Sequence, residues 1–306
     1  MNEPFRKLAI VGLGLIGSSI AHAARRGKLA DEVVGFDASA DVRARAAKIG
    51  FCDRIADDIA AAVQGADLVI LSTPVGAYKS VGEAIAPHLT VGAIVSDVGS
   101  VKGAVIRDIG PSIPVGVHFI PAHPIAGTEF SGPEAGFATL FDGRWAILTP
   151  LAGADAVAVA RLRAFWEGLG SQVDEMDASH HDLVLAITSH LPHLIAYNIV
   201  GTAHDLEAVT EGEVIKYSAS GFRDFTRIAA SDPTMWRDIF LNNREAVLEV
   251  LGRFNEDLSQ LQRAVREGNG EMLFDTFTRT RAIRKTIIEM GQESAAPNFG
   301  RDQKKP

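Results

Sequence analysis

The sequence contains a single cysteine, Cys52, among its 306 residues. One cysteine excludes an internal disulfide and a cysteine-based metal site. The first residues, MNEPFRK, lead directly into an apolar segment and lack the pattern of a signal peptide. No apolar run approaches the roughly 20 residues that are needed to span a bilayer. These absences predict a cytoplasmic protein that has no membrane-spanning segment.

An excess of positive charge is also absent. The chain has 30 basic and 38 acidic residues, a net charge of −8, which argues against nucleic acid or an anionic membrane as the main partner. A local basic pocket for an anionic metabolite remains compatible with this balance. With 47% hydrophobic and 22% charged residues, the composition is typical of a soluble globular protein, and the length allows two domains.

The first motif is a glycine-rich loop. Residues 8–11 form a short apolar segment, followed by GLGLIG at 12–17 and then by a good helix sequence. This is G-x-G-x-x-G between a strand and a helix, where the glycines allow a tight turn, close approach of a pyrophosphate and close helix packing. The helix N-terminus would face the phosphates with free N–H groups. The cofactor-binding residues predicted in this loop are Gly12, Gly14, Leu15, Ile16 and Gly17.

A carboxylate follows the second predicted strand. Residues 32–36 form this strand and Asp37 ends it, twenty residues after the last glycine of the loop. A carboxylate there can accept hydrogen bonds from the adenosine ribose and would repel a 2′-phosphate, which favours NAD over NADP. Arg43 and Arg45 lie a turn or more into the next helix, which weakens the case for NADP but does not exclude it. The structural alternative is that Asp37 belongs to a solvated acidic turn.

Two further strands end in polar segments. Residues 67–71 form a buried strand, and Ser72, Thr73 and Pro74 after it are predicted to form a lip over the cofactor. Residues 93–96 form the next strand.

The segment after that next strand is DVGSVK, at 97–102. It brings a hydroxyl, Ser100, and an ammonium, Lys102, to the carboxyl end of a strand. The alternative is structural: Ser100 caps a helix and Lys102 lies on the surface.

The strands and helices predict a doubly wound α/β nucleotide-binding domain of the Rossmann type, spanning residues 1–177. Residues 145–148 and 173–176 read as further strands that flank a helix near 154–169.

From residue 178 the pattern becomes helical, and residues 178–293 are predicted to form an all-helical substrate and dimerisation domain. Residues 179–203 form a long helical pattern that Pro192 should interrupt and kink. The polar tail, residues 294–306, is predicted to be disordered.

The stretch VHFIPAHPIAGTE, residues 117–129, leaves an apolar strand-like run and ends in a polar loop. It carries His123, and ligands of open α/β sheets bind at strand ends. An imidazole can take or give a proton near neutral pH. The alternative is a loop histidine that is bonded to nearby backbone.

The helical half holds further polar side chains with regular spacing. Ser189 and His193 are four residues apart and share a helix face. His190 and His193 could form a metal pair, but no carboxylate partner is evident, so we expect no metal. Asp224 and Arg227 at i, i+3 suit a guanidinium that clamps a substrate carboxylate, or else a structural ion pair.

Four separated motifs occur in one order: DVGSVK at 97–102, HPIAGTE at 123–129, SHLPH at 189–193 and FRDFTRIA at 222–229. With them the chain resembles the prephenate/arogenate (cyclohexadienyl) dehydrogenase family, from the glycine loop to about Arg284. The resemblance implies NAD-dependent oxidative decarboxylation of prephenate, arogenate or both, in tyrosine biosynthesis. We also expect a homodimer formed through the helical half.

The resemblance also implies roles for single residues. His123 would hydrogen-bond the ring hydroxyl of the substrate and help to remove its proton, and Ser100 would support the same oxygen. Arg227 would hold a substrate carboxylate. Ser189 and His193 would lie near the side chain of the substrate. Glu129 and Asp224 would shape and gate the cleft.

Two other functions compete with this interpretation. One is a dehydrogenase with the same domain order that acts on a β-hydroxy acid, although such enzymes usually rely on a lysine of the helical domain. The other is a nicotinamide-dependent sensor or scaffold, which would not need His123 and Arg227. The choice between prephenate and arogenate stays open, because no single residue can be assigned to it.

Overall fold

The structure is a computed structural model that describes residues 3–128, 130–207, 217 and 219–289. The chain forms two compact units, Met1–Leu248 and Glu249–Pro306. The tail for which the sequence predicts disorder lies outside the described residues.

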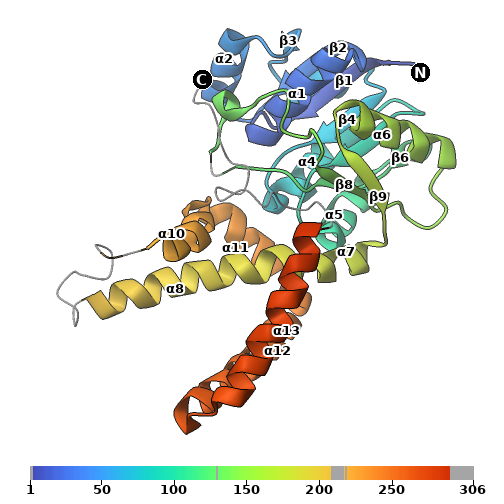
Figure 1. The fold of residues 1–306 in the computed structure, drawn as a ribbon. Helices are drawn as coiled ribbons and strands as arrows, with labels where there is room; N and C mark the ends of the chain where they lie inside the picture. Colours follow the sequence, from blue (N-terminus) through green and yellow to red (C-terminus); the bar gives the residue numbers. More distant parts are fainter. Residues whose placement is uncertain (1–2, 129, 208–216, 218, 290–306) are drawn as a thin grey trace. The chain divides into compact units, whose positions relative to one another are not determined.

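A six-stranded sheet, parallel throughout, organises the first unit (Figure 1). Its spatial order is β3-β2-β1-β4-β5-β6, so the chain winds outward from β1 first in one direction and then in the other. This order confirms the doubly wound Rossmann-type fold. The strands are β1 (Phe5–Val11), β2 (Ala30–Phe36), β3 (Arg54–Ile55), β4 (Leu68–Leu71), β5 (Ile94–Asp97) and β6 (His118–Phe119).

Helices cover both faces of this sheet. They are α1 (Leu15–Gly27), α2 (Ala40–Ile49), α3 (Ile59–Val63), α4 (Tyr78–Ile85), α5 (Lys102–Ile109) and α6 (Ala156–Gly168). Leu8 and Ile10 of β1 pack with α1 and α6, whereas Ala9 and Val11 pack with α4 and α5 on the other face. Burying one such large aliphatic side chain contributes about 1.5–3 kcal/mol, so the alternation of β1 stabilises both layers.

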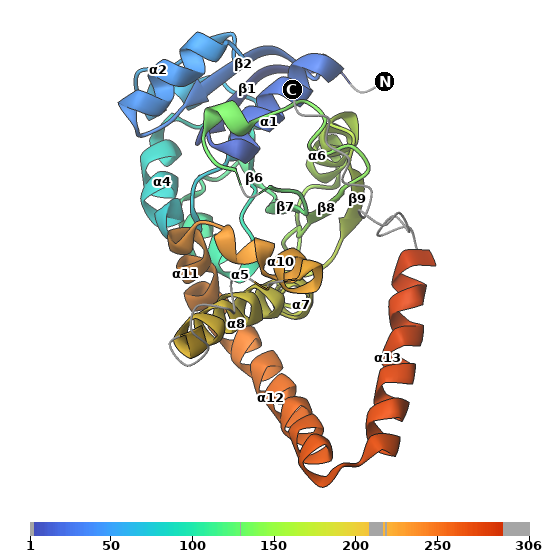
Figure 2. The same cartoon turned by 60° about the vertical axis from the view of Figure 1, so that its left-hand side comes forward.

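Three more strands form a separate small sheet, and Figure 2 shows them side by side. They are β7 (Ala122–Pro124), β8 (Trp145–Leu148) and β9 (Gln172–Glu175). β7 runs antiparallel to β8, and β8 runs parallel to β9. Strands near 145–148 and 173–176 were predicted, and they lie in this second sheet. Through β7, the second sheet holds the segment that carries His123.

After β9 every regular element among the described residues is helical. The helices are α7 (Ala178–Leu185), a π-helical turn (Ala186–His190), α8 (Leu191–Glu207), α10 (Ser220–Thr226), α11 (Pro233–Asn242), α12 (Arg244–Glu267) and α13 (Gly270–Glu289). Single 3₁₀ turns occupy Val75–Ala77, Ala86–His88, Gly110–Ser112, Pro133–Ala135 and Arg227–Ala230.

The predicted interruption at Pro192 takes the form of the π-helical turn that ends two residues before it. Proline has no N–H to donate to the carbonyl of Thr188, and its ring crowds that carbonyl. The helix therefore widens and continues into α8. π-Helical turns occur often at functional sites, and this one holds Ser189 and His190.

The helical stretch Ala178–Leu206 spans 29 residues with a mean hydropathy of 1.5, long and apolar enough by composition to cross a membrane. The expectation that no stretch reaches this length is wrong here. The apolar residues of this helix are interspersed with serine, threonine, histidine and asparagine and with Asp182 and Asp205, so its mean hydropathy is high although no single apolar run is long. Such composition also suits a helix that packs against another protein chain.

Candidate functional site

The glycine loop has the geometry that a dinucleotide requires. Gly12 has φ +99°, and a Cβ there would lie 2.5 Å from the carbonyl oxygen of Ser72. A Cβ on Gly17 would overlap the carbonyl of Gly12, while nothing lies within 4 Å of the same position on Gly14. The first and third glycines therefore allow close backbone contacts that a side chain would block, and the second leaves room for a phosphate.

The loop opens into a cavity of about 600 Å³ at the carboxyl ends of β1, β4 and β5. The hydroxyls of Ser72 and Thr73 are buried there without a hydrogen-bond partner in the described chain. Buried polar groups need partners, so these two fit a polar ligand. The predicted residues that line the cavity are Gly14, Leu15, Ile16, Ser72, Thr73, Pro74, Ser100 and His123.

Asp37 links the end of β2 to the glycine loop. It accepts the backbone N–H of Leu13 at Oδ2 and that of Ser39 at Oδ1, both at 2.9 Å. Arg43 donates to the backbone oxygen of Asp37 at 2.7 Å, and Arg45 pairs with two carboxylates of its surroundings. Both guanidinium groups are thus held by acceptors of the chain itself.

His123 lies within β7, opposite Ile147, and its side chain is largely buried beside the cavity. Its Nδ1 lies 2.9 Å from Nε2 of His181, and Nδ1 of His181 lies 2.8 Å from Oδ1 of Asp182. The alternative of a loop histidine bonded to backbone is therefore wrong. His123 belongs to a buried row of three polar side chains.

Burial holds both rings of this row in the neutral form. The pKa of His123 lies well below its ordinary value, because burial disfavours the charged ring and because His181, Lys102 and His190 lie near it. Burial also lowers the pKa of His181, although Asp182 opposes this effect. A neutral imidazole keeps a lone pair that can accept a proton.

A buried ion pair holds the neighbouring strand ends together. Lys102 Nζ lies 2.6 Å from Oδ2 of Asp97, and both side chains are fully buried. Asp97 also accepts the N–H of Gly99 and the hydroxyl of Tyr78, and Lys102 donates to the carbonyl of Ala122. The alternative of a surface lysine is wrong: Lys102 ties α5 and β5 to β7 directly before His123, and Asp97 adds the bond to α4.

Asp182 caps the helix that carries this lysine. α5 begins at Lys102, and Val101 at the N-cap position makes no side-chain bond. Instead Asp182 accepts the N–H of Lys102 at 2.7 Å and that of Gly103 at 2.8 Å. The alternative of Ser100 as the cap is therefore wrong, and Ser100 lies at the cavity wall.

His193 is held on the helical side. Its Nδ1 lies 2.9 Å from the backbone oxygen of Ser189, and its ring stacks on Trp236 at 3.6 Å. Burial lowers the pKa of His193; the hydrogen bond to the backbone of Ser189 opposes this shift, and the charge of Arg227 adds to it. Ser189 and His193 are therefore in contact, as the predicted shared face requires, through the ring of His193 and the backbone of Ser189.

The cavity brings together the cofactor loop, Ser100 and His123, but four predicted substrate residues are not among the described residues that line it: Ser189, His193, Asp224 and Arg227. The helical half reaches the cavity through Ala230–Pro233, Met235 and Ile239. Glu129 lies outside the described residues. Its neighbours Thr128 and Phe130 line the cavity.

The burial of several polar residues cannot be predicted from the sequence. Asp97 and Lys102 stand in a motif that was noted, but their burial depends on contacts distant in sequence. Asn243 donates to Nδ1 of His190 at 3.1 Å and to the backbone oxygen of Asp182 at 2.8 Å. The one local signal was the pair His181-Asp182 in the first turns of a helix, close after a strand.

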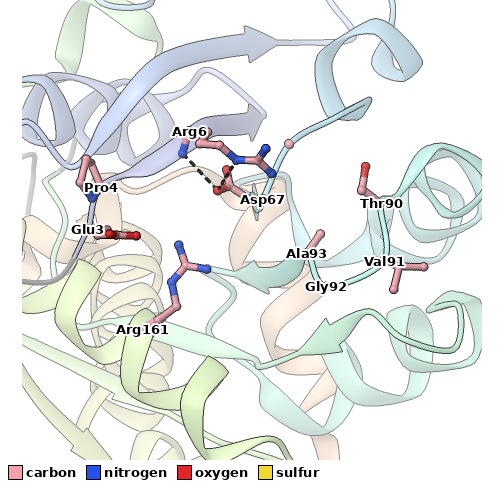
Figure 3. Close-up of a pocket in the computed structure, with 10 residues that line it drawn as sticks. Glu3, Pro4, Arg6, Asp67, Thr90, Val91, Gly92, Ala93 and Arg161 are labelled. Carbon is pink, nitrogen blue, oxygen red and sulfur yellow. Dashed lines mark hydrogen bonds and ion pairs between the residues drawn. The ribbon is translucent and has the colours of Figure 1, made fainter.

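A second hollow, of about 460 Å³, lies at the amino ends of β1, β4 and β5, at the edge of the sheet opposite the glycine loop (Figure 3). Arg6, Asp67, Thr90 and Arg161 line it, and Arg6 Nε lies 3.7 Å from Asp67. Ligands of parallel sheets bind at the carboxyl ends of the strands, so we place the chemistry at the cavity beside His123.

A dinucleotide-binding loop that opens into a cavity at the strand ends is the mark of a dinucleotide-dependent oxidoreductase. Residues 20–175 match the family described as prephenate dehydrogenase, nucleotide-binding domain, and residues 177–279 match prephenate dehydrogenase, dimerization domain. The chain belongs to the prephenate dehydrogenase family.

Relatives of this family are similar in sequence to nearly the whole chain. A cyclohexadienyl dehydrogenase of Zymomonas mobilis is 44% identical over 283 residues, covering 92% of this chain and 96% of the relative. A prephenate dehydrogenase of Bacillus subtilis is 33% identical over 300 residues, 98% of this chain and 80% of the relative.

Solved structures agree as well. Prephenate dehydrogenase from Aquifex aeolicus, in complex with hydroxyphenyl propionate and NAD+, superposes with a TM-score of 0.87 at 33% identity, covering 94% of this chain and all of that one. Arogenate dehydrogenase from Synechocystis gives 0.78 at 28% identity, covering 92% and 99%.

The buried histidines predict how stability depends on pH. Burial lowers the pKa of His190 from 6.5 to about 4, so the folded chain binds fewer protons than the unfolded chain between these values. Stability is therefore fully present above pH 6.5 and falls with acid, by up to about 1.4 kcal/mol per pH unit for each such histidine. Urea unfolding at pH 7, 6 and 5 measures this slope.

His190→Asn should give a shallower slope than the wild type, whereas His88→Asn, at an exposed histidine, should leave the slope unchanged. Equal slopes for His190→Asn and the wild type would contradict the role of burial at this ring.

Proposed function

We propose that the protein catalyses the NAD-dependent oxidative decarboxylation of prephenate, arogenate or both, forming 4-hydroxyphenylpyruvate or tyrosine in the cytoplasm. The observation that carries this proposal is His123, a neutral buried imidazole beside the dinucleotide cavity in a chain of this family. The Aquifex relative holds NAD+ and a hydroxyphenyl acid together, which supports the same pairing of ligands here.

The glycine loop and the lip Ser72-Thr73-Pro74 would hold the dinucleotide. The N–H groups at the start of α1 would face its pyrophosphate, and the hydroxyls of Ser72 and Thr73 would bond its polar groups. Bound there, oxidised nicotinamide supplies the acceptor for a hydride. The chain's task is to orient the substrate against it and to exclude water.

His123 would move the proton. As the hydride leaves C4 of the substrate ring, the C4 hydroxyl gives its proton to the imidazole and becomes a carbonyl. The bond between C1 and the ring carboxylate then breaks, CO2 leaves, and its electron pair makes the ring aromatic. The resulting phenolate recovers the proton from His123, so no net proton is released. A general base of this kind contributes about 10²–10⁴-fold in rate.

The helical half would hold the rest of the substrate. We assign Arg227 to a substrate carboxylate, and its charge already reaches His193. Ser100 at the cavity wall would support the hydroxyl oxygen beside His123. The remaining assignments follow the resemblance: Ser189 and His193 near the side chain, and Glu129 and Asp224 at the cleft.

We place the boundary between the two functional regions at Asp177, which caps α7 by accepting the N–H of His180. Residues 1–177 would then bind the dinucleotide, and residues 178–293 would bind substrate and pair two subunits. The match to a dimerization domain supports this division. Apolar side chains exposed along Ala178–Leu206 support pairing through that helix: Ile187, Ile199, Val200 and Leu206.

The activity test separates proton transfer from substrate holding. The wild type, given NAD and prephenate or arogenate, should form NADH. His123→Asn should lower kcat by about 10²–10⁴-fold with little change in KM, because only the base is lost. Arg227→Ala should raise KM by about tenfold to a hundredfold, because a charge-assisted bond is worth about 1.5–3 kcal/mol.

Two exposed residues give matched controls for this test: His88→Asn, and Arg223→Ala on α10, directly before the 3₁₀ turn that begins at Arg227. Both should behave as the wild type. A His123→Asn enzyme with normal kcat would remove the histidine from the mechanism, and a wild type inactive on both substrates would refute the function.

Asp37 should set the preference for NAD. Asp37→Ser should raise KM for NAD by about tenfold or more and narrow the discrimination against NADP, since a charged acceptor near the ribose is lost. Asp53→Ala removes a comparable aspartate that accepts a backbone N–H of β2 at 2.8 Å, and it should leave the NAD-to-NADP ratio unchanged. Equal use of NADP and NAD by the wild type would contradict this role.

The dimer is tested by light scattering at micromolar concentration. We expect about twice the chain mass of 32.6 kDa, because the exposed apolar helix needs a partner surface. Val200→Glu should shift the mass toward the monomer, whereas Val157→Glu, at an exposed position of α6, should not. A wild-type monomer would contradict the proposed pairing.

A further inference from the structure

In the row of polar side chains behind His123, the direction of each hydrogen bond is fixed, beginning with Asp182 as the acceptor. Oδ1 of Asp182 accepts the backbone N–H of Lys102, and Oδ2 accepts that of Gly103. Backbone N–H groups can only donate, so the carboxylate acts as an acceptor at both oxygens. Nδ1 of His181, at 2.8 Å from Oδ1, must then carry a proton and donate it.

The direction passes through His181 to the active-site ring. Because burial keeps His181 neutral, it has one N–H, and with the proton on Nδ1 its Nε2 is bare. That bare nitrogen lies 2.9 Å from Nδ1 of His123, which therefore donates to it. His123 is neutral too, so its own Nε2 keeps the lone pair.

We propose that His181 and Asp182 are positioning residues that fix the tautomer of His123, so that Nε2 of His123 is the atom that takes the substrate's proton. The proposal deepens the proposed function and rests on it. Neither residue needs to touch substrate or cofactor. Which nitrogen of a histidine is free is set by the bond that the other nitrogen makes, and here that bond comes from His181.

The surroundings favour a ring that takes the proton and returns it. Lys102 and His190 face the pair, and a positive charge on either disfavours a lasting charge on His123. The ring of His181 is fully buried, and both of its nitrogens have partners in one row, which is how a buried polar ring avoids the cost of lost hydrogen bonds.

The tautomer can be read directly by nitrogen NMR of the full-length protein with ¹⁵N-labelled histidine and bound NAD. The His123 signals are assigned by their loss in His123→Asn. We expect a protonated Nδ1 and a bare Nε2 on His123 in the wild type. A proton on Nε2 of His123 would overturn the proposal.

Two variants of His181 sharpen the test. His181→Phe keeps a ring but offers no acceptor, so His123 should lose its fixed tautomer and kcat should fall by about tenfold or more, with KM little changed. His181→Gln offers an amide oxygen as acceptor, so it should keep the tautomer and retain more activity than His181→Phe.

A purely structural role for His181 would lower the stability of both variants while the tautomer and kcat of His181→Phe stayed as in the wild type. That result would overturn the proposal. Failure of the proposed function is a separate outcome, because it would appear as a wild type that forms no NADH from either substrate.

Discussion

The site depends on the hydrogen bonds that the carboxylate of Asp182 accepts. This carboxylate stands at the start of the helical half, yet it accepts two backbone N–H bonds from the first turn of α5 in the nucleotide-binding half. The same carboxylate bonds His181, the neighbour of His123. A single group therefore joins the two regions of the chain and orients the ring that faces the cavity.

The buried pair Asp97–Lys102 complements this interaction from the other side. Removing one partner of such a pair costs about 3–5 kcal/mol, because it leaves an unpaired charge in the interior. Through Ala122, the lysine holds the strand that carries His123. Burial lowers the pKa of that ring, and the charge of Lys102 adds to the effect. Packing of β7 in the core thus sets both the position of His123 and its neutral state.

Much of this architecture could be predicted from local patterns. The glycine loop, Asp37 and the apolar strands specified the nucleotide-binding fold, because each pattern acts over a few residues. The burial of Lys102 and the bond between His123 and His181 could not be predicted in this way, since they join residues 20 and 58 positions apart. Short motifs give residue types and spacing, whereas the direction of a hydrogen-bond row needs three-dimensional contacts.

The most direct measurement for this account is a neutron crystal structure of the deuterium-exchanged protein with bound NAD. The account predicts deuterium on Nδ1 of both His181 and His123, and a bare Nε2 on His123 that faces the cavity. Deuterium on Nε2 of His123, with Nδ1 bare, would contradict the account, because the ring could not take a proton from the substrate at that atom.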